Sequence, residues 1–249
     1  MTVNEERSRP QKLSPMQLTK TATSIRSLAK SANTMEELAG SLTNLIFDRL
    51  RTPSGSHACA LVRFFRTVRF CELNAELQHK ASKSYGQLAP DVKFLTLLGT
   101  TGSEPQWNKR QSSSGHQLIP LFSADMVARA PMIARLFNQL GVNISSLLDS
   151  GPNQLEFVDP ADREYNIFFV QNAKNSPFIP SQEEFVEPHK IGSVVGYGSL
   201  LPDGEFYTVV MFFKTILLSE IQKGFSSLAL SSTIACLSLP ADRPLFITT

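Results

Sequence analysis

Apolar residues near the start of the chain recur at helical spacing. After Pro15, which can open a helix, a thin apolar stripe is formed by Leu18, Ile25, Leu28 and Ala32. Thr34 and Glu37 have the spacing of a capping box, which marks the start of a second helix. The apolar face of that helix comprises Leu38, Leu42, Leu45, Ile46 and Leu50. The pattern therefore predicts two consecutive amphipathic helices.

Apolar runs of strand length follow the two helices. They cover residues 57–70, 92–100, 165–172, 193–201 and 206–213. The turn Pro202-Asp203-Gly204 joins the last two runs into a hairpin. The run "FYTVVMFF" (206–213) is too apolar for a strand with one wet face, so we expect it at the centre of a sheet.

Further helices are predicted between and after these strands. They cover residues 71–86, which end at Gly86, a segment from Ser123 to Gly141, and a short stretch at 181–190. Pro131 should kink or divide the second of these. Ser219 and Gln222 are expected to cap the final helix, whose buried side comprises Ile221, Phe225, Leu228, Ala229 and Ala235.

This order of elements predicts an α+β protein. We expect a central, mostly antiparallel sheet with helices grouped on one face and long loops over the other. Residues 15–239 would form a single domain with a long inserted loop and helix region at 101–150. The polar segment 1–14 would be a disordered lead, and 240–249 a tail.

Composition and charge narrow the function. The 249 residues carry a formal net charge of only +2, which gives no reason to expect a nucleic acid or an anionic membrane as partner. Three scattered cysteines favour a reducing compartment, and no apolar leader or bilayer-spanning segment is evident, so a cytoplasmic location is expected. We interpret Arg63, Arg66 and Arg69 as strand-edge and loop charges, with a phosphate site as the alternative.

A family resemblance lies in the last 60 residues. The segments that carry it are Ile191-Gly192-Ser193, Asp203-Gly204, Leu228-Ala229 and Ile234-Ala235. In this order and spacing they resemble the C-terminal half of a GAF domain, although Ile and Gly are swapped and Tyr207-Thr208-Val209 stands where small glycines are common. The middle segment "EPQWNKRQSSSGHQLIPL" (104–121) is also similar to sensory domains that precede kinase or cyclase modules in bacterial signalling proteins.

The resemblance implies a sensor or regulatory module without catalysis. Its sheet and loops would form a pocket for a small ligand, and its terminal helices would form a homodimer that signals to a downstream protein. GAF domains bind cyclic nucleotides, tetrapyrroles or haem, or small metabolites, and some have no known ligand, so the ligand remains unidentified. Two alternatives are a degenerate interaction or dimerisation module with a filled pocket, and a cysteine-dependent reductase of the same fold.

The residues show no catalytic motif such as a P-loop, GxSxG or HExxH. His57 and Cys59 share a strand face, but two ligands do not make a metal site, and a structural pair is the alternative. Cys71 opens a predicted helix, where the dipole would lower its pKa. Cys59 and Cys236 are interpreted as buried structural residues.

The loop 104–116 supplies the main candidates for ligand binding. Trp107, Arg110 and His116 combine an aromatic plate with a guanidinium and an imidazole, which suits a planar or anionic ligand. Strand residues that could line the same face are Tyr165, Phe168, Tyr197 and Tyr207. The alternative is that Trp107 packs on the sheet, Arg110 pairs with a nearby acid, and the strand aromatics serve the core.

Overall fold

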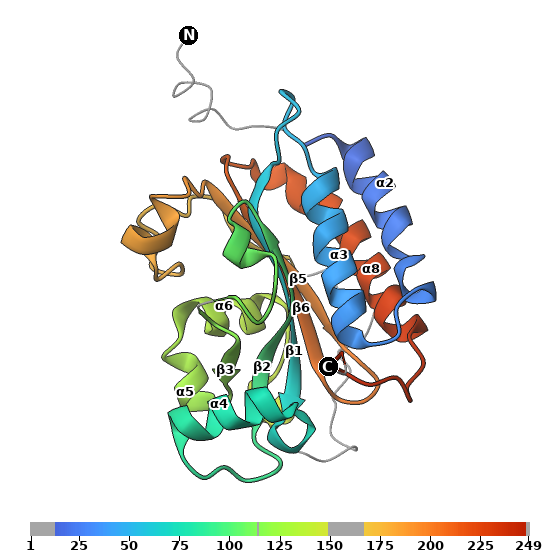
Figure 1. The fold of residues 1–249 in the computed structure, drawn as a ribbon. Helices are drawn as coiled ribbons and strands as arrows, with labels where there is room; N and C mark the ends of the chain where they lie inside the picture. Colours follow the sequence, from blue (N-terminus) through green and yellow to red (C-terminus); the bar gives the residue numbers. More distant parts are fainter. Residues whose placement is uncertain (1–12, 114, 149–166, 248–249) are drawn as a thin grey trace.

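The computed structural model describes residues 13–113, 115–148 and 167–247 (Figure 1). Its strands are β1 (Cys59–Arg69), β2 (Lys93–Gly102), β3 (Leu118–Pro120), β4 (Phe168–Val170), β5 (Ser193–Leu200) and β6 (Phe206–Phe213). Its α-helices are α2 (Pro15–Ile25), α3 (Met35–Arg49), α4 (Ala75–Tyr85), α5 (Ala124–Ala128), α6 (Pro131–Gln139), α7 (Ile144–Leu148) and α8 (Gln222–Ser238). The expected α+β class is confirmed.

The strands form a six-stranded sheet in the order β3-β2-β1-β6-β5-β4, and every neighbouring pair is antiparallel. β1 and β6 are at its centre, and every residue of β6 is buried. The expected central position of 206–213 is therefore correct. Because successive side chains of a strand point to opposite faces, β6 supplies Tyr207, Val209 and Met211 to one face and Thr208 and Val210 to the other.

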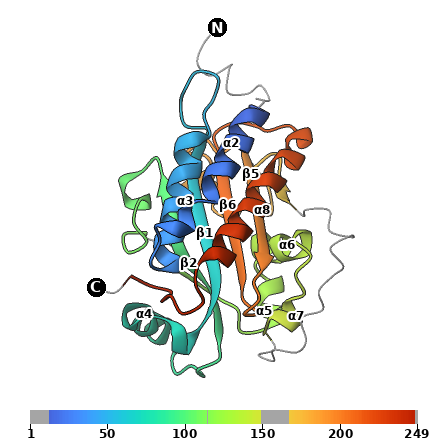
Figure 2. The ribbon, with the colours of Figure 1, turned by 90° about the vertical axis from the view of Figure 1, so that its right-hand side faces the viewer.

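Helices α2, α3 and α8 cover one face of the sheet (Figure 2). Their apolar stripes and the sheet enclose the larger of two hydrophobic clusters, which includes Leu38, Leu42 and Phe225. α2 and α8 lie side by side in this layer, and α8 also packs on β5 (Figure 1). The segments that pack here come from both ends of the chain, so the layer forms only when the chain closes on itself.

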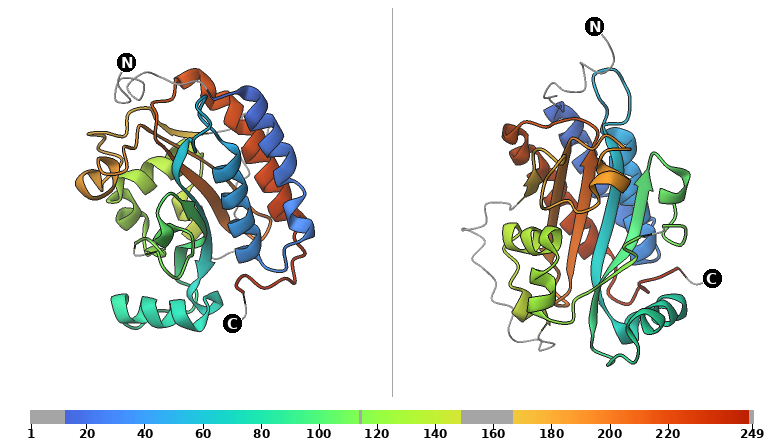
Figure 3. Two further views of the ribbon diagram at one scale, coloured as in Figure 1. Left: turned by 45° about the horizontal axis from the view of Figure 1, so that its top comes forward. Right: turned by 90° about the vertical axis from the view of Figure 1, so that its left-hand side faces the viewer.

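The opposite face is covered by short helices as well as loops (Figure 3, right). The expectation of loops alone is thus incomplete. α5, α6 and α7 lie over one part of the sheet, and a π-helical turn at Gln182–Val186 lies over another. Pro131 divides the predicted helix as expected, because it stands at the first position of α6.

Local signals at the helix ends agree with the sequence in two places and differ in one. The Thr34 hydroxyl accepts a hydrogen bond from the backbone N–H of Glu37 at 3.0 Å, and α4 ends at Gly86, which has φ 80°. The predicted cap of α8 is wrong. Ser219 instead opens a 3₁₀ turn (Ser219–Ile221), and Ile221 precedes α8 without a side-chain cap.

The segment after Pro240, expected to be a tail, packs back onto the fold. The carbonyls of Pro244 and Leu245 accept hydrogen bonds from the first backbone N–H groups of α3, at 3.2 and 2.9 Å. Phe246 is buried in the larger cluster. These carbonyls satisfy donors that have no partner inside the helix, so residues 240–247 help to begin α3.

The sheet and the helical layer approach most closely where β2 passes α3. A Cβ atom at Gly99 would overlap the backbone carbonyl of Ala39 and lie 2.9 Å from the backbone nitrogen of Gly40. Only glycine allows this approach. Gly40 itself has open space where its Cβ would be.

These two glycines form a matched pair for testing the contact. We expect Gly99→Ala to lower the free energy of unfolding by about 1–3 kcal/mol, because α3 must move away from β2. Gly40→Ala should raise it by about 0.5–1 kcal/mol through helix propensity. Urea denaturation followed by circular dichroism measures both. Equal stability of the two variants would contradict the close approach.

Candidate functional site

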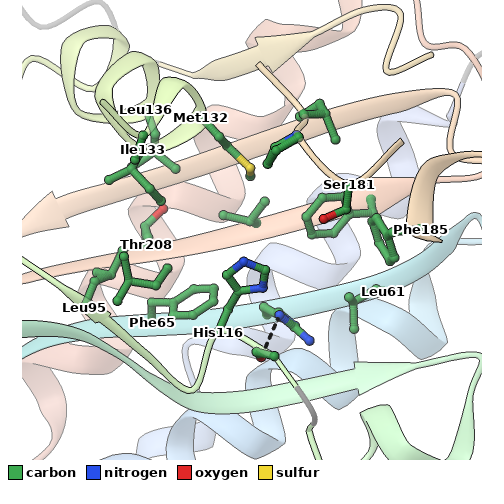
Figure 4. Close-up of a pocket in the computed structure, with 18 of the residues that line it drawn as sticks. Leu61, Phe65, Leu95, His116, Met132, Ile133, Leu136, Ser181, Phe185 and Thr208 are labelled. Carbon is green, nitrogen blue, oxygen red and sulfur yellow. Dashed lines mark hydrogen bonds between the residues drawn. The ribbon is translucent and has the colours of Figure 1, made fainter. Parts of the chain in front are cut away.

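A pocket of about 430 Å³ lies on the sheet face opposite α2, α3 and α8 (Figure 4). This volume falls within the range of about 300–1,000 Å³ that is usual for small-molecule sites. Its floor is formed by three neighbouring strands, β2, β1 and β6. The floor residues are Leu61, Arg63, Phe65, Leu95, Thr208, Val210 and Phe212.

The walls come from segments far apart in the sequence. In Figure 4, Met132, Ile133 and Leu136 of α6 face the strands, with Ser181 and Phe185 on another side. The ring of His116 enters from the loop before β3. Most of the lining is apolar, and a few polar groups converge on it. This combination is typical of a site for a small organic molecule.

Arg63 is the basic residue on the pocket floor. It lies in the middle of β1, pairing with Thr100 of β2 and Val210 of β6, and shares its face with Leu61 and Phe65. Its Nη2 donates to the Ser113 hydroxyl at 3.0 Å. Its Nε is buried and has no hydrogen-bond partner. Burial lowers the pKa of this guanidinium to about 10, because the cation loses its water.

The other two arginines of this strand have acidic partners. Arg66 points to the opposite face and forms an ion pair with Asp203, and Arg69 pairs with Glu72 at 2.6 Å. Among the residues that the structure describes, Arg63 forms no ion pair. The interpretation of Arg63 as a strand-edge charge is therefore wrong, since β1 is a central strand.

His116 separates the pocket from a smaller one of about 190 Å³ beside α4. Its backbone has φ 58°, a left-handed conformation that is uncommon outside glycine. The side chain keeps accessible surface because it faces the open pocket, yet protein surrounds it on the other sides. Burial, and secondarily the charge of Arg63, lower the pKa of His116.

Trp107 belongs to an aromatic cluster in the pocket wall. Its ring lies 5.6 Å from Phe185 and 4.5 Å from His189, and Phe185 packs edge-on against Phe212 at 4.9 Å. The Thr100 hydroxyl donates to the Trp107 carbonyl at 2.9 Å and so ties this loop to β2. Trp107 therefore both packs on the sheet and lines the pocket, which combines the two interpretations of the sequence.

Arg110 lies outside the pocket, in a buried ion pair. Its Nε donates to Glu36 at 2.8 Å, and its guanidinium lies 5.7 Å from the ring centre of Phe246. Glu36 also accepts from the backbone N–H of Ile247 at 3.1 Å. The alternative of an acid-paired Arg110 describes this geometry. The pair joins the pocket loop to the start of α3 and to the C-terminal segment.

Tyr197 and Tyr207 do not line the pocket either. Both phenols point into the helical layer, where Tyr197 bonds the Ser232 hydroxyl at 2.9 Å and Tyr207 bonds Thr233 at 2.7 Å. Burial raises the pKa of both phenols. In β6 the pocket takes Thr208, Val210 and Phe212, which alternate with Tyr207, and Tyr197 of β5 shares the helical face with Tyr207. Tyr165 lies outside the described residues, and Phe168 is buried on the pocket side without lining the pocket.

The three cysteines and His57 lie outside the pocket. Cys59 and Cys236 are buried, and burial raises the pKa of both thiols. Cys71 is exposed in a 3₁₀ turn (Phe70–Glu72) that precedes α4, so the expected position at the start of the helix is wrong. His57 stacks on Phe47 and bonds its carbonyl at 3.0 Å.

Three further findings concern metal binding, membrane-spanning helices and similarity to known proteins. Within the described residues, no group of three or more His, Cys, Asp or Glu side chains could hold a metal ion. No helix in those residues is both long enough and apolar enough to cross a membrane. No model of a known protein family matches the chain, and no curated protein matches it.

Sequence reasoning missed the floor of the pocket. Arg63, Phe65 and Thr208 supply a cation, an aromatic ring and a hydroxyl to the floor. Only the pairing of the strands shows that they share a face. A usable signal was present in the parity of "LVRFF" (61–65), where Arg63 alternates with Val62 and Phe64. An arginine inside an apolar central strand indicates a buried charge.

The titration of His116 tests the electrostatics of the pocket. We expect its pKa in the folded protein to lie below the ordinary value of about 6.5, and Arg63→Met to raise it by removing the nearby charge. Because the native state then binds fewer protons than the unfolded chain, His116 makes the protein less stable as the pH falls through this range. Proton NMR of the four histidines, assigned with His116→Asn, measures the midpoint. A midpoint at or above 6.5 would be inconsistent with this site.

Proposed function

We propose that the protein is a non-catalytic, GAF-like sensory or regulatory domain of a bacterial signalling system. It binds a small molecule in the pocket on the sheet. The observation that carries this proposal is the apolar pocket of about 430 Å³, with a few inward polar groups, on the face that the main helical layer leaves open. The resemblance to GAF domains implied a ligand pocket at this place.

A route from the pocket to the helical layer supports the regulatory part of the proposal. The loop that brings Trp107 and His116 to the pocket also contains Arg110. Through Glu36, Arg110 is joined to the start of α3 and to the backbone of Ile247. A ligand that moves this loop would therefore shift a buried ion pair, which tolerates displacement poorly. In this proposal, that shift carries the signal toward a downstream protein.

The signalling form is proposed to be a homodimer built on α8. An apolar stripe on the outer side of that helix comprises Leu230, Ile234 and Leu237, at the alternating spacing of a coiled-coil seam. Ser231, Ser232 and Ala235 of the same helix are buried inside the chain and are not available for this contact. Arg26, which follows α2, donates to Ser231 at 3.1 Å, and Ser232 bonds Tyr197 of β5, so these two serines face neighbours within the chain.

The two alternatives have less support. A cysteine-dependent reductase needs an accessible thiolate at the site, but none of the three cysteines lines the pocket. A filled interaction module would need large residues inside the pocket. Tyr207 and Phe213 face the helical layer, and Phe212 forms part of the pocket wall without closing it.

Native mass spectrometry of the purified protein tests ligand binding and assembly together. We expect a dimer that carries extra mass, and Ile133→Phe should remove at least about nine-tenths of that mass by filling the pocket from α6. Ile144→Phe is the matched control, because Ile144 packs in the same hydrophobic layer without lining the pocket. Retention of the mass by Ile133→Phe, or its loss from both variants, would contradict binding in this pocket.

A further inference from the structure

The charge of Arg63 has no compensation in the described part of the protein. Burying a cation without a counter-charge costs free energy, so buried arginines are usually paired. Glu184 is the acidic side chain that lines the pocket; it is exposed and forms no ion pair with Arg63. Two buried cations of the same sheet, Arg66 and Lys93, are each paired with a carboxylate.

The present contacts of Arg63 leave most of its donors free. A guanidinium has five N–H donors. Nη2 reaches the Ser113 hydroxyl at 3.0 Å, Nη1 reaches the Gly115 carbonyl at 3.5 Å, and the buried Nε has no partner. The contacts with Ser113 and Gly115 therefore use only some of the hydrogen-bond donors of Arg63. Because Nε is closed off from the open pocket, a ligand there would be met by the remaining N–H groups of Nη1 and Nη2, which can bind the two oxygens of a carboxylate or phosphate as a fork.

The rest of the lining defines the other part of the ligand. Around Arg63 lie Leu61, Phe65 and Val210 on the floor, with Met132 and Phe185 in the walls. Burial and the charge of Arg63 lower the pKa of His116, which disfavours a second positive charge here, and a neutral imidazole offers one donor and one acceptor. One cation among apolar walls fits a ligand with one anionic head and an apolar body.

We propose that the pocket binds an organic oxyanion with an apolar alkyl or aryl body, its anionic head paired with Arg63. This inference rests on the proposed ligand-binding function and specifies the ligand class. A carboxylate is the head that the single cation favours. A phosphate monoester shares the same chemistry and is distinguished in the experiment.

Matched probes separate the contribution of the anionic head of the ligand from that of its apolar body. Octanoate and 1-naphthylacetate are compared with their primary amides, which have nearly the same shape and no charge, and with octyl phosphate. Isothermal titration calorimetry measures affinity. The fluorescence of Trp107, the single tryptophan, shows whether octanoate and octanamide enter this pocket. We expect the carboxylates to bind about 10- to 100-fold more tightly than the amides.

Variants of two arginines on the same strand show whether Arg63 makes the difference. Arg63→Met should reduce the carboxylate affinity to that of the amide and leave amide binding unchanged. Arg63→Lys should retain a preference for the anion because it retains a positive charge. Arg69→Met is the matched control: Arg69 lies at the end of β1, pairs with Glu72 and does not line the pocket, so its probe affinities should equal those of the native protein.

The outcomes distinguish this inference from the function on which it rests. A preference for either anion over the amides that disappears in Arg63→Met supports the inference, and the ratio of octanoate to octyl phosphate affinity assigns the head group. Equal binding of carboxylates and amides by the native protein overturns the inference even if Arg63→Met does not fold, and it leaves a ligand pocket standing. Absence of binding by every probe, without a Trp107 response, overturns both.

Discussion

The pairing of β1 with β6 at the centre of the sheet is the constraint on which the remaining structure depends. Both strands have neighbours on each side and covered faces, so all of their side chains except the exposed Arg69 enter one of two interiors. One interior is filled by α2, α3 and α8, and the other contains the pocket. Strand parity places the half-buried Arg63 on the pocket side, where its charge has no ion pair among the described residues and is costly to desolvate.

The two interiors are linked by polar contacts between distant segments. Arg110 and Glu36 connect the pocket loop to α3, and the backbone of Ile247 bonds the same carboxylate. On the other side of the sheet, Tyr197 and Tyr207 bond to α8. Removing one partner of a buried ion pair costs about 3–5 kcal/mol, so the Arg110–Glu36 contact holds the pocket loop against α3.

Much of the fold could be predicted from the sequence because its signals are local. The apolar run 206–213, the cap at Thr34 and the break at Pro131 each depend on a few neighbouring residues. β3 was missed because it has only three residues and ends in proline. It exists because Phe94, Leu95 and Thr96 of β2 offer an open edge with which it pairs. No local pattern contains that information.

The site was predictable only in part for the same reason. Trp107 and His116 stand out by residue type and do line the pocket. Arg110 is equally conspicuous, but its partner Glu36 lies 74 residues away in the chain and cannot be identified by spacing. Arg63 lies on the pocket floor and not at a strand edge, and for Tyr197 and Tyr207 the core alternative describes the structure, because which face a strand residue occupies depends on what covers that face.

A crystal structure of the protein grown with octanoate would test the central claim most directly. The account predicts a carboxylate within about 2.7–3.2 Å of the Arg63 guanidinium nitrogens, with the alkyl chain between Phe65 and α6. An empty pocket with Arg63 paired to a carboxylate of the protein itself would contradict the account.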